Sequence, residues 1–153
     1  SKQSRSSAAS DVYKRQIKRR VEYYVNRCGT RNPFEIAKQL NIEVQLGNPG
    51  CDGCYMFLKN HRYIFLNQDL PESELRVVMA HELGHAILHR KQNCYFIRNK
   101  TFFLNSKYEI EANKFAAELL LPDELLNEYA GFTKKQIAKT LGCHECLIEL
   151  KLH

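Results

Sequence analysis

The chain lacks any long run of apolar residues. No stretch reaches the roughly eighteen consecutive apolar residues of a membrane-spanning helix, and the N-terminal residues lack the apolar core of a secretion signal. The sequence also contains no internal repeat. These absences argue against a membrane protein, a secreted protein and a repeat protein, and we expect a cytoplasmic protein.

A strong charge of one sign is also lacking. The 23 Lys and Arg against 17 Asp and Glu give a formal net charge of +6. Residues 1–16 hold four basic side chains and one acidic side chain, so they supply +3 of this charge and leave only +3 on the rest. Such a weak excess gives little support to nucleic-acid binding. Residues 1–16 are polar, and we expect them to form a disordered or artefactual tail outside the fold.

The remaining residues are enough for one domain with a modest core and too few for two ordinary domains. We expect residues 17–130 to form the main domain and residues 131–153 to form a C-terminal helical extension of the same domain.

The first half of this domain is predicted to contain a small, largely antiparallel sheet. Apolar residues at helical spacing predict a helix over 17–26, and a second helix is expected to end near residue 40. Alternating apolar and polar residues predict a strand over 42–46. Residues 54–58 and 63–66 then have the pattern of a hairpin.

The second half is predicted to be mostly helical. A helix that begins near residue 69 has apolar side chains around most of its girth up to residue 88, which indicates a central position in the domain. Residues 90–106 show no clear period, and we expect an irregular loop there. Further helices are predicted over 107–121, over 134–141 and over about 145–152. A short helix that ends at Tyr129 is expected after the first of these. The whole pattern indicates an α+β domain.

A His-Glu-x-x-His string lies on the central helix, at His81-Glu82-Leu83-Gly84-His85. Residues four apart share a helix face with Cβ atoms about 5–6 Å apart, so two imidazoles at this spacing can hold one metal ion. Glu82 lies on a neighbouring face, close enough to take a proton from an attacking water. A zinc hydrolase needs this combination of two ligands, an open position and a carboxylate base.

A third ligand is expected on the predicted helix over 107–121. Glu109 and Asn113 share a face, so the Glu109 carboxylate can complete the coordination of Zn²⁺. The Asn113 amide can accept a hydrogen bond from the ring N–H of a ligand histidine. Glu111 is the competing ligand, but it points about 160° away from the Asn113 face on an ideal helix, so we favour Glu109.

His89 continues the four-residue series but is not expected to share the ion. It lies about 12 Å from His81 along the helix axis. We expect it to be half-buried near the helix end, where a positive charge is favoured. The metzincin pattern needs a histidine six residues after His85, and Lys91 stands there, which excludes that class.

The string HELGHAILH, followed by EIEANKFAAELLLP, resembles the ImmA/IrrE family of zinc metallopeptidases. The upstream run NPFEIAKQLNIEV fits the same family, so the resemblance covers about residues 30–125. It implies that residues 17–130 form a metallopeptidase domain in which a zincin-type helix packs against a second ligand-bearing helix. Family members typically lie beside a helix-turn-helix repressor and cleave it, which implies a neighbouring repressor as the protein substrate.

Carried over position by position, the resemblance implies a complete set of site residues. His81, His85 and Glu109 are expected to bind Zn²⁺, and Glu82 is expected to be the catalytic base. Asn113 matches a motif position that is Asn or Asp in the family. The donor that stabilises the developing oxyanion stays open among four tyrosines, which are Tyr55, Tyr63, Tyr95 and Tyr108.

Four of the six cysteines form two Cys-x-x-Cys pairs, Cys51/Cys54 and Cys143/Cys146. Together these pairs could form a four-thiolate zinc site, but their wide separation is not that of a zinc ribbon or finger. A redox pair at Cys51/Cys54 would need a helix N-terminus to stabilise the thiolate, whereas a strand is predicted to follow. We expect reduced thiols.

Residues 133–142 resemble the opening of a helix-turn-helix and support an alternative function. In this alternative the protein is a non-proteolytic, zinc-containing regulator that binds a repressor or DNA. The second helix of the pair carries Glu145 and Glu149 and few side chains suited to reading bases. We therefore expect the two helices to pack on the domain or to dock a partner, and a zinc endopeptidase remains the main prediction.

Overall fold

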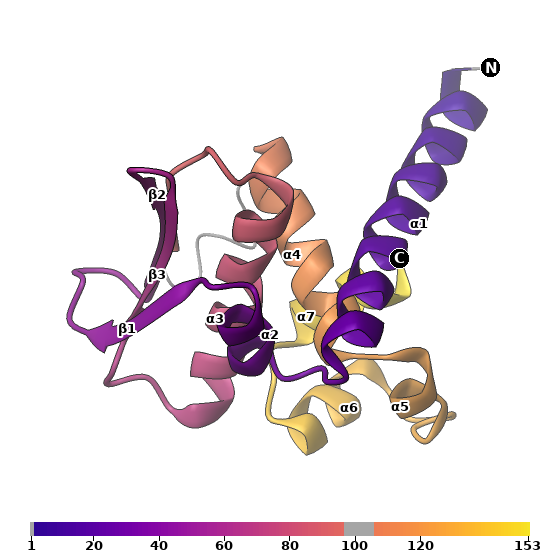
Figure 1. The fold of residues 1–153 in the computed structure, drawn as a ribbon. Coiled ribbons are helices and arrows are strands. Elements are labelled where there is room, and N and C mark those ends of the chain that lie inside the picture. Colours follow the sequence, from indigo (N-terminus) through magenta and orange to yellow (C-terminus); the bar gives the residue numbers. More distant parts are fainter. Residues whose placement is uncertain (1, 97–105) are drawn as a thin grey trace.

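The computed structural model describes residues 2–96 and 106–153, and the side chains of residues 11–93 and 106–153. Its elements are α1 (Lys2–Cys28), α2 (Pro33–Gln39), β1 (Glu43–Gly47), β2 (Gly53–Leu58), β3 (His61–Asn67), α3 (Glu72–Leu88), β4 (Cys94–Phe96), α4 (Lys107–Leu120), α5 (Asp123–Asn127), α6 (Lys134–Leu141) and α7 (Glu145–Leu152). The predicted α+β class is confirmed (Figure 1).

The strands form one mixed sheet in the order β1-β3-β2-β4. β2 pairs antiparallel with both β3 and β4, whereas β1 pairs parallel with β3. The predicted hairpin and the largely antiparallel sheet are therefore confirmed. The prediction of a loop over 90–106 is wrong at Cys94–Phe96, because these three residues form β4 and pair with residues 53–55. A strand this short cannot display a period of its own.

Helix α3 lies between the sheet and α4, as Figure 1 shows. Ten consecutive residues of α3, from Val78 to Ile87, are buried. A helix packed on both sides must be apolar around its whole girth, since it has no face left for water. The predicted central position of this helix is confirmed.

Helix α1 departs from the expected boundary at residue 17, because it already begins at Lys2. Two residues before this boundary contact the rest of the chain. Tyr13 packs against the hydrophobic core, and Lys14 Nζ donates a hydrogen bond to the Lys151 carbonyl at 3.0 Å. No Gly or Pro interrupts residues 2–28, so nothing in the backbone stops the helix before Gly29, which has φ +70°.

The two C-terminal helices share the core of the rest of the chain. α7 packs against α4 and α6, and its Leu147 and Ile148 are fully buried. Lys151 is buried as well, and its Nζ lies 2.6 Å from Glu118 Oε2 and 2.8 Å from Asp123 Oδ1. These ion pairs hold α7 on α4 and on the start of α5.

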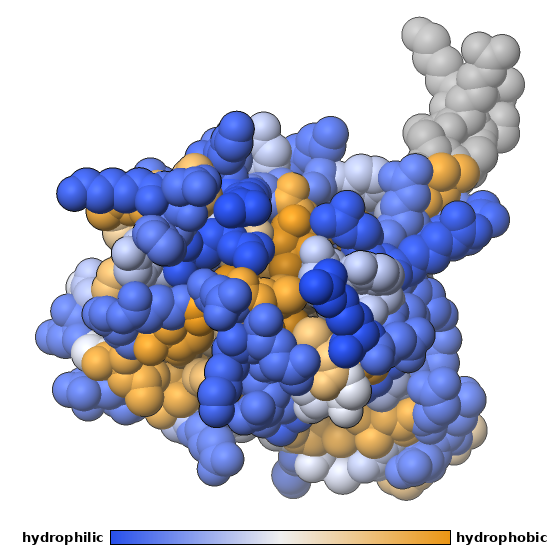
Figure 2. Space-filling view, viewed as in Figure 1, coloured by the Kyte–Doolittle hydropathy of each residue, from blue (hydrophilic) through white to orange (hydrophobic). Residues whose placement is uncertain are grey.

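Hydrophilic residues cover most of the face seen in Figure 2, and hydrophobic residues gather near its middle, over α3 and α4. Within residues 2–96 and 106–153, no helix combines the length and the apolar character needed to cross a membrane.

Candidate metal centre

Helices α3 and α4 bring three potential ligands to one point. His81 Nε2 lies 2.9 Å from Glu109 Oε2, and His85 Nε2 lies 3.1 Å from Glu109 Oε1. The two imidazole Nε2 atoms are 3.1 Å apart. Among the described residues, these three form the group whose ligand atoms all lie within 4.8 Å of one another, as one metal ion requires.

The close approach of the two helices depends on Gly84. A Cβ atom at this position would lie 3.2 Å from the Ala112 Cα and 3.1 Å from the Phe115 Cβ. Because the first of these is a backbone atom, it cannot move aside without shifting α4. Glycine therefore lets α4 come close enough for Glu109 to reach the two histidines, and this explains a residue that costs helix stability.

Asn113 fixes the orientation of His81. The Nδ1 atom of His81 lies 2.7 Å from the Asn113 Oδ1 atom. A carbonyl oxygen can only accept a hydrogen bond, so His81 Nδ1 carries the hydrogen and Nε2 of the neutral ring carries the lone pair. Burial lowers the pKa of His81, which favours this neutral form.

The lone pair of His81 thus faces other electron-rich atoms. Burial raises the pKa of Glu109, but the neighbouring His81 and His85 outweigh burial and lower that pKa to about 2, so the carboxylate is ionised. Buried lone pairs and a carboxylate that converge in this way need a cation between them. The chemistry of the cluster therefore suits a metal ion.

Glu82 stands beside this cluster without any hydrogen-bond partner. Its side chain is fully buried, and neither carboxylate oxygen has a partner within the described structure. Burial, with a further contribution from the charge of Glu109, raises its pKa well above the ordinary value. Buried carboxylates are normally paired, and an exception of this kind marks a functional group.

Strand β2 closes over Glu82 through Gly53, the first residue of the strand. A Cβ atom on Gly53 would lie 2.6 Å from Val78 Cγ1 and 3.4 Å from Glu82 Cγ. The first residue of β2 must therefore be glycine for the strand to pack this tightly on α3. The close approach joins segments far apart in sequence, so no local pattern could reveal it.

His89 differs from its prediction. It is 7% exposed rather than half-buried, and burial lowers its pKa to about 4, so the ring is uncharged at neutral pH. The prediction that His89 carries a positive charge at the helix end is therefore wrong. His89 contacts His85 on one side, and on the other side its Nε2 lies 2.5 Å from Glu111 Oε2. Glu111 thus contacts His89, whereas Glu109 approaches His81 and His85.

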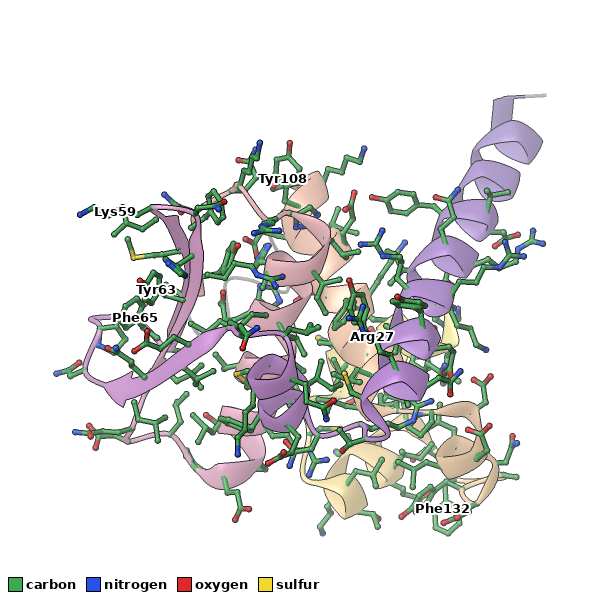
Figure 3. All side chains as sticks on the ribbon, viewed as in Figure 1. Arg27, Lys59, Tyr63, Phe65, Tyr108 and Phe132 are labelled. Carbon is green, nitrogen blue, oxygen red and sulfur yellow. The ribbon has the colours of Figure 1, made fainter. Side chains whose placement is uncertain are left out.

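The candidate oxyanion donors are spread over the molecule. Tyr55 is fully buried and its hydroxyl donates to the Arg90 carbonyl. Tyr63 lies on the face of the sheet turned away from α3, whereas its neighbour Ile64 enters the core (Figure 3). Tyr108 lies at the start of α4, with its ring centroid 4.7 Å from that of His89. The side chain of Tyr95 is outside the described residues.

The cysteines do not add a metal group among the described residues. Cys28, Cys51, Cys54, Cys143 and Cys146 are free, and the side chain of Cys94 is not described. Burial raises the pKa of Cys54 to about 12, which is opposite to the lowered pKa of a reactive thiol. No disulfide joins these five cysteines in the described part of the chain.

Comparisons with known proteins agree with the geometry. The model of the peptidase family described as the IrrE N-terminal-like domain matches residues 37–145. The chain is 40% identical over 139 residues to an uncharacterized immunity region protein 2 of Bacillus phage phi105, with 88% of each chain covered. It is 33% identical over 143 residues to the metallopeptidase ImmA of Bacillus subtilis (strain 168), covering 89% of this chain and 83% of the relative.

Proposed function

Because the chain belongs to the IrrE N-terminal-like family of metallopeptidases, the ImmA/IrrE family, we propose that it is a zinc-dependent endopeptidase that cleaves a protein substrate. The observation that carries this proposal is the meeting of His81, His85 and Glu109 beside the unpartnered carboxylate of Glu82. The proposed ligands are these three residues, and the proposed base is Glu82.

The ligand atoms support zinc as the metal. Two neutral imidazole nitrogens and one carboxylate oxygen are a ligand set of catalytic zinc sites, in which a fourth position stays open. Bound there, zinc would act as a Lewis acid toward the peptide carbonyl and would acidify water. Asn113 would hold His81 in the tautomer that presents Nε2 to the ion.

Glu82 would move the proton in the reaction. Its unpartnered oxygens are free to accept a proton from the attacking water and to deliver it to the nitrogen of the leaving amine. A raised pKa makes this carboxylate a stronger base, which suits the step in which it takes the proton from water. Tyr108 is the oxyanion donor that we favour, since its ring contacts the site through His89.

We propose that the substrate is a helix-turn-helix transcriptional repressor encoded beside this protein. The relatives support this substrate by their descriptions, one as an immunity region protein of a phage and one as the metallopeptidase ImmA. The free thiols support a reducing compartment, and we place the protein in the cytoplasm.

The alternative, a non-proteolytic regulator that binds a repressor or DNA, has weaker support for its DNA-binding form. A recognition helix must present side chains to the groove. Helix α7 instead buries Leu147, Ile148 and Lys151 against the domain, and its first turn carries Glu145. A regulator that only binds a repressor differs from the peptidase by the absence of cleavage.

The test is cleavage of the neighbouring repressor by the zinc-loaded protein. We compare the wild type with Glu82→Gln and with Glu72→Gln, which makes the same change at an exposed position on the same helix. The wild type and Glu72→Gln should cleave the repressor into the same fragments. Glu82→Gln should cleave it about 10²–10⁴-fold more slowly at equal zinc content.

Two results contradict the proposal in different ways. Equal cleavage by Glu82→Gln overturns the role of Glu82. Tight binding of the repressor without cleavage, by the wild type and both variants, overturns the peptidase and favours the regulator.

A further inference from the structure

We propose that His89 and Glu111 form a hydrogen-bonded relay that positions the metal ligand His85. The inference rests on the proposed metal site and adds two residues to it. Neither residue contacts the ion in this proposal, so both are positioning residues rather than ligands or bases.

The relay follows from which nitrogen of each ring faces which neighbour. His85 directs Nε2 toward Glu109 and His81, so its Nδ1 must carry the hydrogen when Nε2 binds a metal. That Nδ1 lies 3.1 Å from His89 Nδ1. Two N–H groups cannot face each other at this distance, so His89 Nδ1 is the acceptor.

The same reasoning places the hydrogen on the other nitrogen of His89. A neutral ring whose Nδ1 accepts must carry its hydrogen on Nε2. This Nε2 lies 2.5 Å from Glu111 Oε2, an acceptor. The hydrogens therefore run in one direction, from His85 Nδ1 to His89 Nδ1 and from His89 Nε2 to Glu111 Oε2.

Burial makes this relay necessary for His85. The His85 side chain is fully buried and that of His89 is only 4% exposed, so water cannot easily replace the missing acceptor. His81 has the Asn113 amide for the same purpose. Helix α4 would thus orient both histidines, since Asn113 holds His81 directly and Glu111 holds His85 through His89.

The relay predicts how zinc affinity responds to substitutions of its two members. His89→Ala should raise the Kd for zinc about 10–100-fold, the usual effect of removing a partner of a ligand histidine. Glu111→Ala should raise the Kd in the same direction. Glu111→Gln should restore affinity to within about threefold of the wild type, because its side-chain carbonyl still accepts from His89 Nε2.

The experiment measures zinc affinity by competition with a chromophoric chelator, together with the visible spectrum of the cobalt-substituted protein. The spectrum reports the geometry of the ligands, which a merely structural residue would not change. His61→Ala is the matched control, because His61 is an exposed histidine on β3. Its affinity and spectrum should equal those of the wild type.

Each outcome decides the relay. Weaker zinc binding and an altered cobalt spectrum for His89→Ala and Glu111→Ala, with recovery in Glu111→Gln, support it. Wild-type affinity and an unchanged spectrum for His89→Ala overturn it and leave the proposed peptidase intact. If His89→Ala does not fold, the two Glu111 variants decide, and equal affinity of both with the wild type overturns the relay. A wild-type chain that binds no zinc overturns the metal site and the relay together.

Discussion

At the level of single residues, Glu82 has an unusual environment for a carboxylate, because it is buried and has no hydrogen-bond partner among the described residues. A fully buried carboxylate without a hydrogen-bond partner favours its protonated form. Its raised pKa in the folded chain has a consequence for stability. The unfolded chain ionises first as the pH rises past the ordinary value of 4.5, so the metal-free folded state loses stability from there up to the folded pKa.

We predict that Glu82→Gln removes this loss. In urea unfolding of the metal-free protein, the stability advantage of the variant over the wild type should be absent near pH 4 and should grow as the pH rises from the ordinary value of 4.5 toward the folded pKa. Glu72→Gln, at an exposed position of α3, should show no such growing difference. A constant difference between Glu82→Gln and the wild type across this range would contradict the raised pKa.

Local spacing explains which single residues could be predicted. His81, Glu82 and His85 belong to one helical turn and its neighbour, so their mutual placement depends only on helix geometry. The shared face of Glu109 and Asn113 follows in the same way. The surroundings of His89 could not be predicted, because Glu111 and Tyr108 reach it from another helix.

Between elements, the contact of α3 with α4 decides whether the metal centre can form. Gly84 is the point where this contact has no room for a side chain. We predict that Gly84→Ala lowers the free energy of unfolding by up to about 2 kcal/mol, because overpacking costs about 1–3 kcal/mol and the gain in helix propensity returns about 1 kcal/mol. Zinc affinity should fall as well, since α4 carries Glu109.

Gly47→Ala is the control for this prediction. Gly47 ends β1, and no atom outside its own chain neighbours lies within 4 Å of a Cβ built there. Denaturant unfolding and chelator competition measure the two effects. A Gly84→Ala variant as stable and as zinc-avid as Gly47→Ala would show that the close approach is not needed.

Pairing partners explain which elements could be predicted. The hairpin of β2 and β3 has alternation and a short connection, both of which are local. The parallel pairing of β1 with β3 and the three-residue β4 depend on partners elsewhere in the chain. Helix α1 exceeds its predicted length because a polar composition indicates disorder, whereas tertiary contacts such as those of Tyr13 stabilise the helix.

At the scale of the whole molecule, the chain encloses α3 and α4 between the sheet on one side and α1 and α7 on the other (Figure 1). The buried Lys151 joins α7 to Glu118 of α4, and Lys14 of α1 donates to the backbone at the same point. We propose that residues 131–153 belong to the same folding unit as residues 17–130. The metal centre then depends on contacts made along the entire described chain.

The most direct measurement of the central claim is X-ray absorption at the zinc edge of the zinc-loaded protein. We predict one zinc per chain, with two imidazole nitrogens at about 2.0–2.1 Å and carboxylate or water oxygens at about 2.0–2.2 Å. Glu109→Ala should remove one oxygen or replace it by water and weaken binding. Sulfur at about 2.3 Å would place the zinc on the cysteine pairs and would contradict a site at His81, His85 and Glu109.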